Sequence, residues 1–177
     1  MIQKRNILAI CGSTREKSSN KDIINFIAQL GQDHISITHF DISTLPFFNQ
    51  DIKDEQTPQI VIEFRESIRK ADGVLICTPE YVFSLPGILK NALEWTVSTT
   101  VFMDKPTALI TASSSGEKAH ESLLLVMKTL GVKTNEDLCL LISGVKSFLN
   151  ADGDITDTAL IKKLQNLMNA LSSVTSQ

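Results

Sequence analysis

The hydrophobic residues of this chain fall into two kinds of segment that alternate along its length. One kind is a short, continuous apolar run rich in branched residues, which is typical of a strand buried on both faces of a sheet. These runs predict five strands, at residues 6–11, 35–41, 73–78, 106–111 and 137–142.

Longer segments with helical periodicity lie between the apolar runs. Ile23, Phe26, Ile27 and Leu30 are spaced as on one face of a helix, and Gly31 follows as a stop signal. The same periodicity predicts four more helices, over residues 58–71, 87–97, 119–130 and 160–171.

The regular alternation of strands and helices determines the expected architecture. It predicts a parallel sheet covered on both faces, and right-handed crossovers then lead to a doubly wound α/β sandwich, most simply of strand order 2-1-3-4-5. The length of 177 residues suits one domain whose core needs no additional cross-links. We therefore expect residues 1–177 to form a single domain.

The overall composition argues against several classes of protein. With 42% apolar residues, 21% charged residues and a formal charge of −3, the chain lacks the basic surface that nucleic acid binding requires. It shows no apolar run of about 18 residues and no signal-peptide pattern. We therefore expect no contact with nucleic acid or membrane, and a cytoplasmic location.

Three cysteines, Cys11, Cys77 and Cys139, lie far apart in apolar surroundings. They form no CxxC pair, and the cysteine and histidine spacing of a zinc site is absent. We expect all three to be small buried hydrophobic residues, and we expect no bound metal.

Three loops follow the first, third and fourth predicted strands, at residues 12–19, 79–86 and 112–116. Ligands of doubly wound sheets bind beyond the carboxyl ends of the strands, and all three loops are rich in glycine, proline or hydroxyl groups. These loops are the candidate binding site. Residues 43–57 form a long connection, which is a lid, a partner contact or a disordered excursion, and we favour the last two.

The first loop reads GSTREKSSN and precedes a predicted helix, whose N-terminal N–H groups attract anions. Ser13, Ser18 and Asn20 add neutral hydrogen bonds, and Arg15 adds a charge-assisted one. The loop therefore has the chemistry of a cradle for one phosphate. The alternative is that Ser18, Ser19 and Asn20 merely cap the helix, which does not explain why Ser13 and Arg15 occur together.

Other phosphate-binding motifs do not fit the spacing of this loop. A G-x-G-x-x-G fingerprint would need glycine where Thr14 and Lys17 stand, and a P-loop would need glycine at Glu16. A Cys-x5-Arg phosphatase loop is excluded because Arg15 follows Cys11 too closely.

The first loop and the segment PEYVFSLPGILKNALEW, residues 79–95, together carry a resemblance to a known family. The chain resembles the NADPH-dependent FMN reductases, whose members share a GSxRxxSxN loop and a PEY…PGxLKNAxxW segment. The resemblance implies a flavodoxin-like FMN-binding domain that acts as an NAD(P)H oxidoreductase. The similarity continues less specifically through residues 105–116.

The resemblance also implies which residues hold FMN. Those at the phosphate are Ser13, Arg15, Ser18 and Asn20, those along the ring are Pro79, Glu80 and Tyr81, and those at the far end of the ring include Ser113 and Gly116. The redox chemistry belongs to the flavin itself, so no side chain need act as nucleophile or general base.

Two positions depart from the family pattern. Members often carry Asn and a small residue after PEY, whereas this chain has Val82 and Phe83, a change at the expected approach of the nicotinamide or second substrate. The loop at 112–116 also lacks a double glycine that is frequent in the family, so its contact with the flavin is the least supported assignment.

The expected reaction is a ping-pong cycle in which NAD(P)H passes hydride to FMN and a second substrate then takes the electrons. That acceptor is a quinone, a free flavin, an azo compound or a metal ion. The resemblance implies NADPH as donor and a homodimer or homotetramer. The alternatives are a flavodoxin-like electron carrier and a redox-sensing flavin module. Arg15, the single tyrosine and tryptophan and the modest charge disfavour the carrier.

Overall fold

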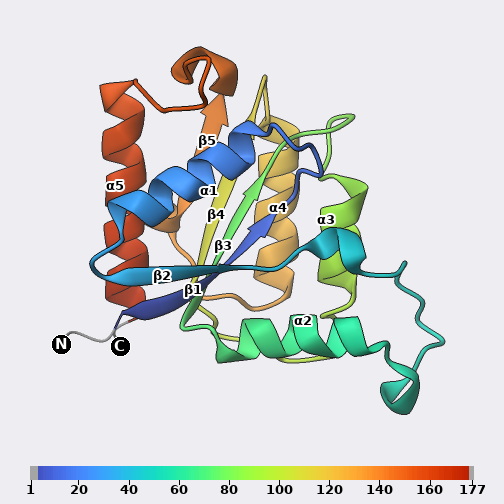
Figure 1. The fold of residues 1–177 in the computed structure, drawn as a ribbon. Coiled ribbons are helices and arrows are strands. Elements are labelled where there is room, and N and C mark those ends of the chain that lie inside the picture. The colour runs from blue at the N-terminus through green and yellow to red at the C-terminus, as the bar shows by residue number, and fades with distance from the viewer. Residues whose placement is uncertain (1–3, 176–177) are drawn as a thin grey trace.

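A five-stranded sheet forms the centre of the protein in the computed structural model, which describes residues 4–175 (Figure 1). The strands are β1 (Arg5–Cys11), β2 (Ile35–His39), β3 (Gly73–Thr78), β4 (Thr107–Ser113) and β5 (Cys139–Ser143). Their order is β2-β1-β3-β4-β5, and every pair of neighbours is parallel. The predicted doubly wound α/β sandwich and its strand order are confirmed.

Helices cover both faces of this sheet (Figure 1). The α-helices are α1 (Ser19–Leu30), α2 (Gln59–Lys70), α3 (Gly87–Glu94), α4 (Glu117–Thr129) and α5 (Thr158–Val174). On one face α2, α3 and α4 pack around Phe64, Leu89 and Leu123. On the other face α1 and α5 pack around Ile23 and Leu164. Among the described helices, none has the length and hydropathy of a bilayer-spanning segment.

The register of the central strands brings their carboxyl ends to the same level. Cys11 at the end of β1 lies opposite Cys77 near the end of β3, and Thr78 lies opposite Thr111 near the end of β4. All residues of β3 are buried, as expected for a strand covered on both faces. The loops that leave β1, β3 and β4 therefore gather at one edge of the sheet.

Short 3-10 turns explain where the predicted strand boundaries are wrong. The turns are η1 (Ile42–Thr44), η2 (Asp54–Gln56), η3 (Glu136–Leu138) and η4 (Val145–Phe148). The carboxylate of Asp41 accepts a hydrogen bond from Ser43 N at 2.9 Å and caps η1, so β2 ends before residue 41. The side chain of Asn135 caps η3 in the same way, and β5 therefore begins at residue 139 rather than 137.

The long connection at residues 43–57 is anchored to α3. The carbonyl of Pro46 accepts hydrogen bonds from the indole N–H of Trp95 at 2.8 Å and from the Asn91 amide at 3.0 Å. The same Asn91 side chain accepts the N–H of Phe48 at 2.7 Å, and Phe48 packs edge-on against Trp95. The expectation of a disordered excursion is therefore wrong for residues 46–48, because their backbone groups are bound to the helix.

The cysteines differ in burial from the prediction. Cys77 is fully buried, as expected, but Cys11 and Cys139 are only half-buried. Burial raises the pKa of all three thiols, and hydrogen bonding from the Ser13 backbone and the nearby Lys21 charge only partly offset this for Cys11. None of the three is thus activated as a thiolate nucleophile.

Gly12 permits the first loop to touch β3, and its replacement tests this contact. A Cβ at Gly12 would lie 2.2 Å from Thr78 Oγ1 and 2.8 Å from Thr78 Cβ, neither of which can move freely. We expect Gly12→Ala to lower the free energy of unfolding by about 1–3 kcal/mol, the usual cost of overpacking, as measured by urea denaturation.

Gly87→Ala is the matched control for this substitution. No atom lies within 4 Å of a Cβ built at Gly87, which opens α3, so alanine there should leave stability unchanged or slightly higher. Equal losses of stability in the two variants would contradict the close approach of Gly12 to β3.

Candidate functional site

The phosphate loop, defined here as residues 12–18, ends at the N-terminus of α1. The first intrahelical hydrogen bond runs from Asp22 N to the carbonyl of Ser18 at 3.0 Å. The N–H groups of Ser19, Asn20 and Lys21 in the first turn thus have no acceptor within the helix. They form a donor set of the kind that binds anions at helix N-termini.

Two buried serines lie on either side of this donor set. Ser13 and Ser18 are each 6% exposed. The Ser13 hydroxyl accepts the N–H of Arg15 at 3.4 Å, which leaves its own hydrogen for a ligand. Ser18 occupies the N-cap position, but its side chain makes no capping hydrogen bond. Capping therefore does not account for the Ser18 hydroxyl.

Asn20 fixes the loop relative to the neighbouring strands. Its amide Nδ2 donates to the carbonyl of Ala112 at 3.2 Å, and its Oδ1 accepts from the thiol of Cys77 at 3.2 Å. The side chain is 4% exposed and is thus committed to the fold. Asn20 can offer a ligand its backbone N–H, while its side chain holds the first turn of α1 against β3 and β4.

The second loop connects to the helix that follows β4. The carboxylate of Glu80 accepts the N–H of Ala119, in the first turn of α4, at 3.0 Å. Gly116 at the N-cap of that helix has no side chain to do this, so Glu80 supplies the cap from a distant loop. The negative charge of Glu80 lies at the positive end of α4.

A tight turn follows Glu80. Tyr81 and Ser84 exchange two backbone hydrogen bonds of 3.0 Å, and Val82 and Phe83 between them have φ angles of 51° and 54°. Positive φ at both central residues defines a type I′ turn, which favours Asn and Gly. The left-handed conformation costs roughly 1–2 kcal/mol per residue that has a Cβ, and more for a β-branched residue such as Val82.

Residues from three loops meet in one hollow of about 220 Å³. Its lining includes eight of the nine residues predicted to bind the cofactor, namely Ser13, Arg15, Ser18, Asn20, Pro79, Glu80, Tyr81 and Ser113. Gly116 does not line it. That residue is buried at the N-cap of α4 with φ +105°, and an added Cβ would lie 3.0 Å from Leu141 Cδ1.

The hollow also has residues that sequence reasoning missed. Lys17 and Ser19 belong to the first loop and helix, whereas Val145 and Lys146 come from η4 after β5. Lys17, Lys146 and Arg15 together bring three cations to one small space. The signal for Lys146 was available, because the segment after β5 leaves the same carboxyl edge of the sheet.

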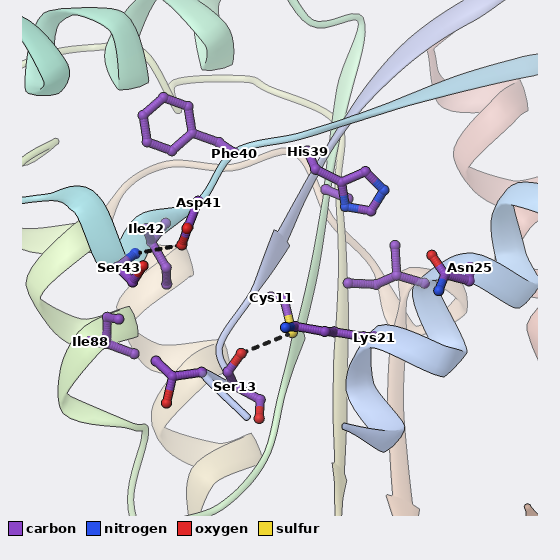
Figure 2. Close-up of a pocket in the computed structure, with 13 residues that line it drawn as sticks. Cys11, Ser13, Lys21, Asn25, His39, Phe40, Asp41, Ile42, Ser43 and Ile88 are labelled. Carbon is purple, nitrogen blue, oxygen red and sulfur yellow. Dashed lines mark hydrogen bonds between the residues drawn. The ribbon is translucent and has the colours of Figure 1, made fainter. Parts of the chain in front are cut away.

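A larger hollow of about 370 Å³ lies between α1, the phosphate loop and the end of β2 (Figure 2). Ser13 is the one predicted site residue in its lining. Figure 2 shows the Lys21 ammonium near the Cys11 thiol in this view, with Asp41 hydrogen-bonded to Ser43 across the hollow. Lys21 and Asp41 carry opposite charges, so this hollow lacks the excess of positive charge found in the smaller one.

His120, one turn into α4, does not line the smaller hollow. Its Nδ1 lies 3.0 Å from the hydroxyl of Thr111, a fully buried residue of β4. Burial lowers the pKa of His120 below its ordinary value, so the ring is neutral near pH 7. His120 is thus part of the packing between α4 and the sheet.

Comparison with known proteins points to one family. The family model of NADPH-dependent FMN reductases matches residues 5–145. A 2-hydroxy-1,4-benzoquinone reductase of a Burkholderia species is 34% identical over 92% of each chain. An NAD(P)H-dependent FMN reductase of Pseudomonas aeruginosa is 32% identical over 93% of this chain and 92% of its own.

A solved structure supports the same fold. The flavoenzyme NAD(P)H:(acceptor) oxidoreductase of Paracoccus denitrificans superposes with a TM-score of 0.77 over 97% of both chains, at 24% sequence identity. At this level of identity the likeness bears on the fold alone.

The Glu80 cap on α4 is testable by substitution. We expect Glu80→Ala to lower the free energy of unfolding by about 0.5–2 kcal/mol, because the Ala119 N–H loses its acceptor. Glu121→Ala, on α4 itself, breaks an exposed ion pair with Lys118 and should cost less stability than Glu80→Ala. Urea denaturation of both variants measures the difference, and equal costs would contradict the capping role.

Proposed function

This chain belongs to the family of NADPH-dependent FMN reductases, and from that premise we propose that FMN binds across the carboxyl ends of β1, β3 and β4. The protein is an FMN-dependent oxidoreductase that uses NAD(P)H. The observation that supports the proposed site most strongly is the convergence of eight predicted residues, from three separate loops, on one hollow.

The donor set of the hollow fits the phosphate of FMN. A phosphate monoester needs several hydrogen-bond donors and neutralisation of nearly two negative charges. We propose that the first-turn N–H groups of α1 and the hydroxyls of Ser13 and Ser18 supply the donors. Arg15, Lys17 and Lys146 supply more than the required charge, and their exposed positions allow them to close over a ligand.

The other loops suit the flavin ring. Pro79 and Tyr81 offer flat surface, and Ser113, at the end of β4, lines the same hollow. We propose that these residues border the ring. Glu80 shapes this part of the site through its hydrogen bond to α4 rather than through a contact of its carboxylate with the ring.

The chemistry that FMN supplies when bound is acceptance of a hydride from NAD(P)H and transfer of two electrons to a second substrate. The residues of this chain bind and orient the partners of that exchange. The buried serines and the tied Asn20 preorganise the phosphate end, so the orientation of the ring is set before the nicotinamide arrives. The cations also favour the approach of the anionic dinucleotide.

We propose a quinone as the second substrate and NADPH as the preferred donor. A relative named above is a 2-hydroxy-1,4-benzoquinone reductase, which supports the quinone, and the description of the family as NADPH-dependent supports the donor. Free flavins, azo compounds and metal ions are further acceptors to be tested.

We also propose that residues 1–177 act as one FMN-binding domain in a cytoplasmic homodimer or homotetramer. An apolar groove between α3 and α4 supports self-association, because Val97 and Leu125, which line it, are 66% and 67% exposed. The three cysteines are all free thiols, as expected in a reducing compartment.

Arg15 is the residue with which to test the phosphate assignment. We expect Arg15→Ala to weaken FMN binding by about 1.5–3 kcal/mol, or roughly ten- to a hundredfold, as measured by titration of flavin fluorescence. The far-UV circular dichroism spectrum should not change. Arg69→Ala is the control, because Arg69 pairs with Glu66 on α2 and should not affect FMN. Unaltered affinity in Arg15→Ala would remove this residue from the site.

The activity itself is tested by an absorption spectrum of the purified protein with FMN, before and after anaerobic addition of NADPH. The proposed reductase predicts flavin bands that bleach without any other protein and return when a quinone is added. Bound flavin that NADPH does not bleach would instead indicate an electron carrier or a redox sensor.

A further inference from the structure

Val82 and Phe83 are unfavourable for the stability of the fold in two respects. Both adopt the left-handed backbone conformation, which disfavours residues that carry a Cβ. Their side chains are also 95% and 78% exposed, so they gain little from packing within the chain. Residues whose backbone strain is not offset by packing within the chain are concentrated at functional sites. The role of Val82 and Phe83 is therefore to contact another molecule rather than other residues of the chain.

The position of the turn indicates which contact this is. Figure 1 shows the loop between β3 and α3 projecting at the carboxyl edge of the sheet, beside the loop between β1 and α1. Pro79, Glu80 and Tyr81 line the smaller hollow, and the turn continues directly from Tyr81. Two reciprocal hydrogen bonds between Tyr81 and Ser84 close the turn, so its two central residues follow directly after a residue of the lining.

We propose that Val82 and Phe83 form an apolar wall for the ring of the electron acceptor, and that they make the enzyme select flat, apolar acceptors over small hydrophilic ones. This inference rests on the proposed FMN site. The lining of the hollow is otherwise rich in serines and cations, which suit phosphate and ribose groups. NAD(P)H carries such groups, whereas a quinone has little besides its ring with which to bind.

The reaction that this wall serves is balanced without a further reagent. NAD(P)H, one proton and a quinone yield NAD(P)⁺ and a hydroquinone, with NAD(P)H as the reductant and the quinone as the oxidant.

A second copy of the chain is the alternative partner for the exposed tip at Val82 and Phe83. The groove lined by Val97 and Leu125 offers a separate apolar surface for such a copy.

The test compares the FMN-loaded wild type with V82N/F83G, which installs the residues that a type I′ turn favours. Steady-state kinetics would use 1,4-naphthoquinone as the apolar acceptor and ferricyanide as the hydrophilic one. Calorimetry would give the affinity of 1,4-naphthoquinone for the oxidised protein without turnover. The variant V82I/F83L keeps the apolar surface, and F47A removes an exposed phenyl ring elsewhere, on the connection at residues 43–57.

In V82N/F83G we expect kcat/KM for 1,4-naphthoquinone to fall about tenfold and its Kd to rise about tenfold, the effect of losing contact with a large apolar side chain. Ferricyanide reduction and FMN affinity should change by less than about twofold. The thermal midpoint should rise, because the backbone strain is relieved. V82I/F83L and F47A should both retain the quinone activity of the wild type.

Three results would overturn the inference. Equal losses of activity with both acceptors would mean that the turn has a general structural role. Unchanged kinetics with 1,4-naphthoquinone would mean that Val82 and Phe83 do not contact the quinone. A change of oligomeric state in V82N/F83G on size-exclusion chromatography would assign the tip to a second copy. A wild type whose flavin NADPH does not bleach would instead disprove the proposed function, and that result is distinct from these three.

Discussion

The buried side-chain amide of Asn20 is the interaction on which the geometry of the site depends. It donates to the carbonyl of Ala112 and accepts from the thiol of Cys77, so one residue ties the first turn of α1 to the ends of both β3 and β4. Gly12 adds a second constraint, because its lack of a side chain lets the phosphate loop approach Thr78. The N–H groups of α1 are thereby fixed over the centre of the carboxyl edge of the sheet, where the other loops meet them.

Around this rigid base the site contains several kinds of group, and each kind has a different role. Buried donors, such as the hydroxyl of Ser18, have fixed positions and suit the orientation of a ligand. Exposed cations, such as Arg15 and Lys146, attract anions over a longer range and can adapt to them. The turn at Val82 and Phe83 is different again, since it breaks the local rules of backbone conformation at the rim of the site. Such violations are expected where function, rather than stability, determines the sequence.

The sequence predicted the strand order and the three site loops because buried parallel strands leave a strong periodic pattern and their carboxyl ends must coincide. It did not predict the contacts that close the site. The carboxylate of Glu80 reaches α4 across 39 positions of sequence, and no local pattern encodes that bond. Lys146 was missed because only the loops after the first, third and fourth predicted strands were expected to form the site, although the segment after β5 leaves the same carboxyl edge of the sheet. The type I′ turn was missed for a physical reason, since Val82 and Phe83 are residues that such a turn disfavours.

A crystal structure of the protein grown with FMN tests the central claim most directly, because it locates the phosphate and the ring independently of activity. The account predicts the phosphate within hydrogen-bond distance, about 2.7–3.2 Å, of the N–H groups in the first turn of α1, with Arg15 beside it and the ring along Pro79 and Tyr81. A phosphate bound instead in the larger hollow near Lys21, or a ring that lies away from the loop after β3, would contradict it.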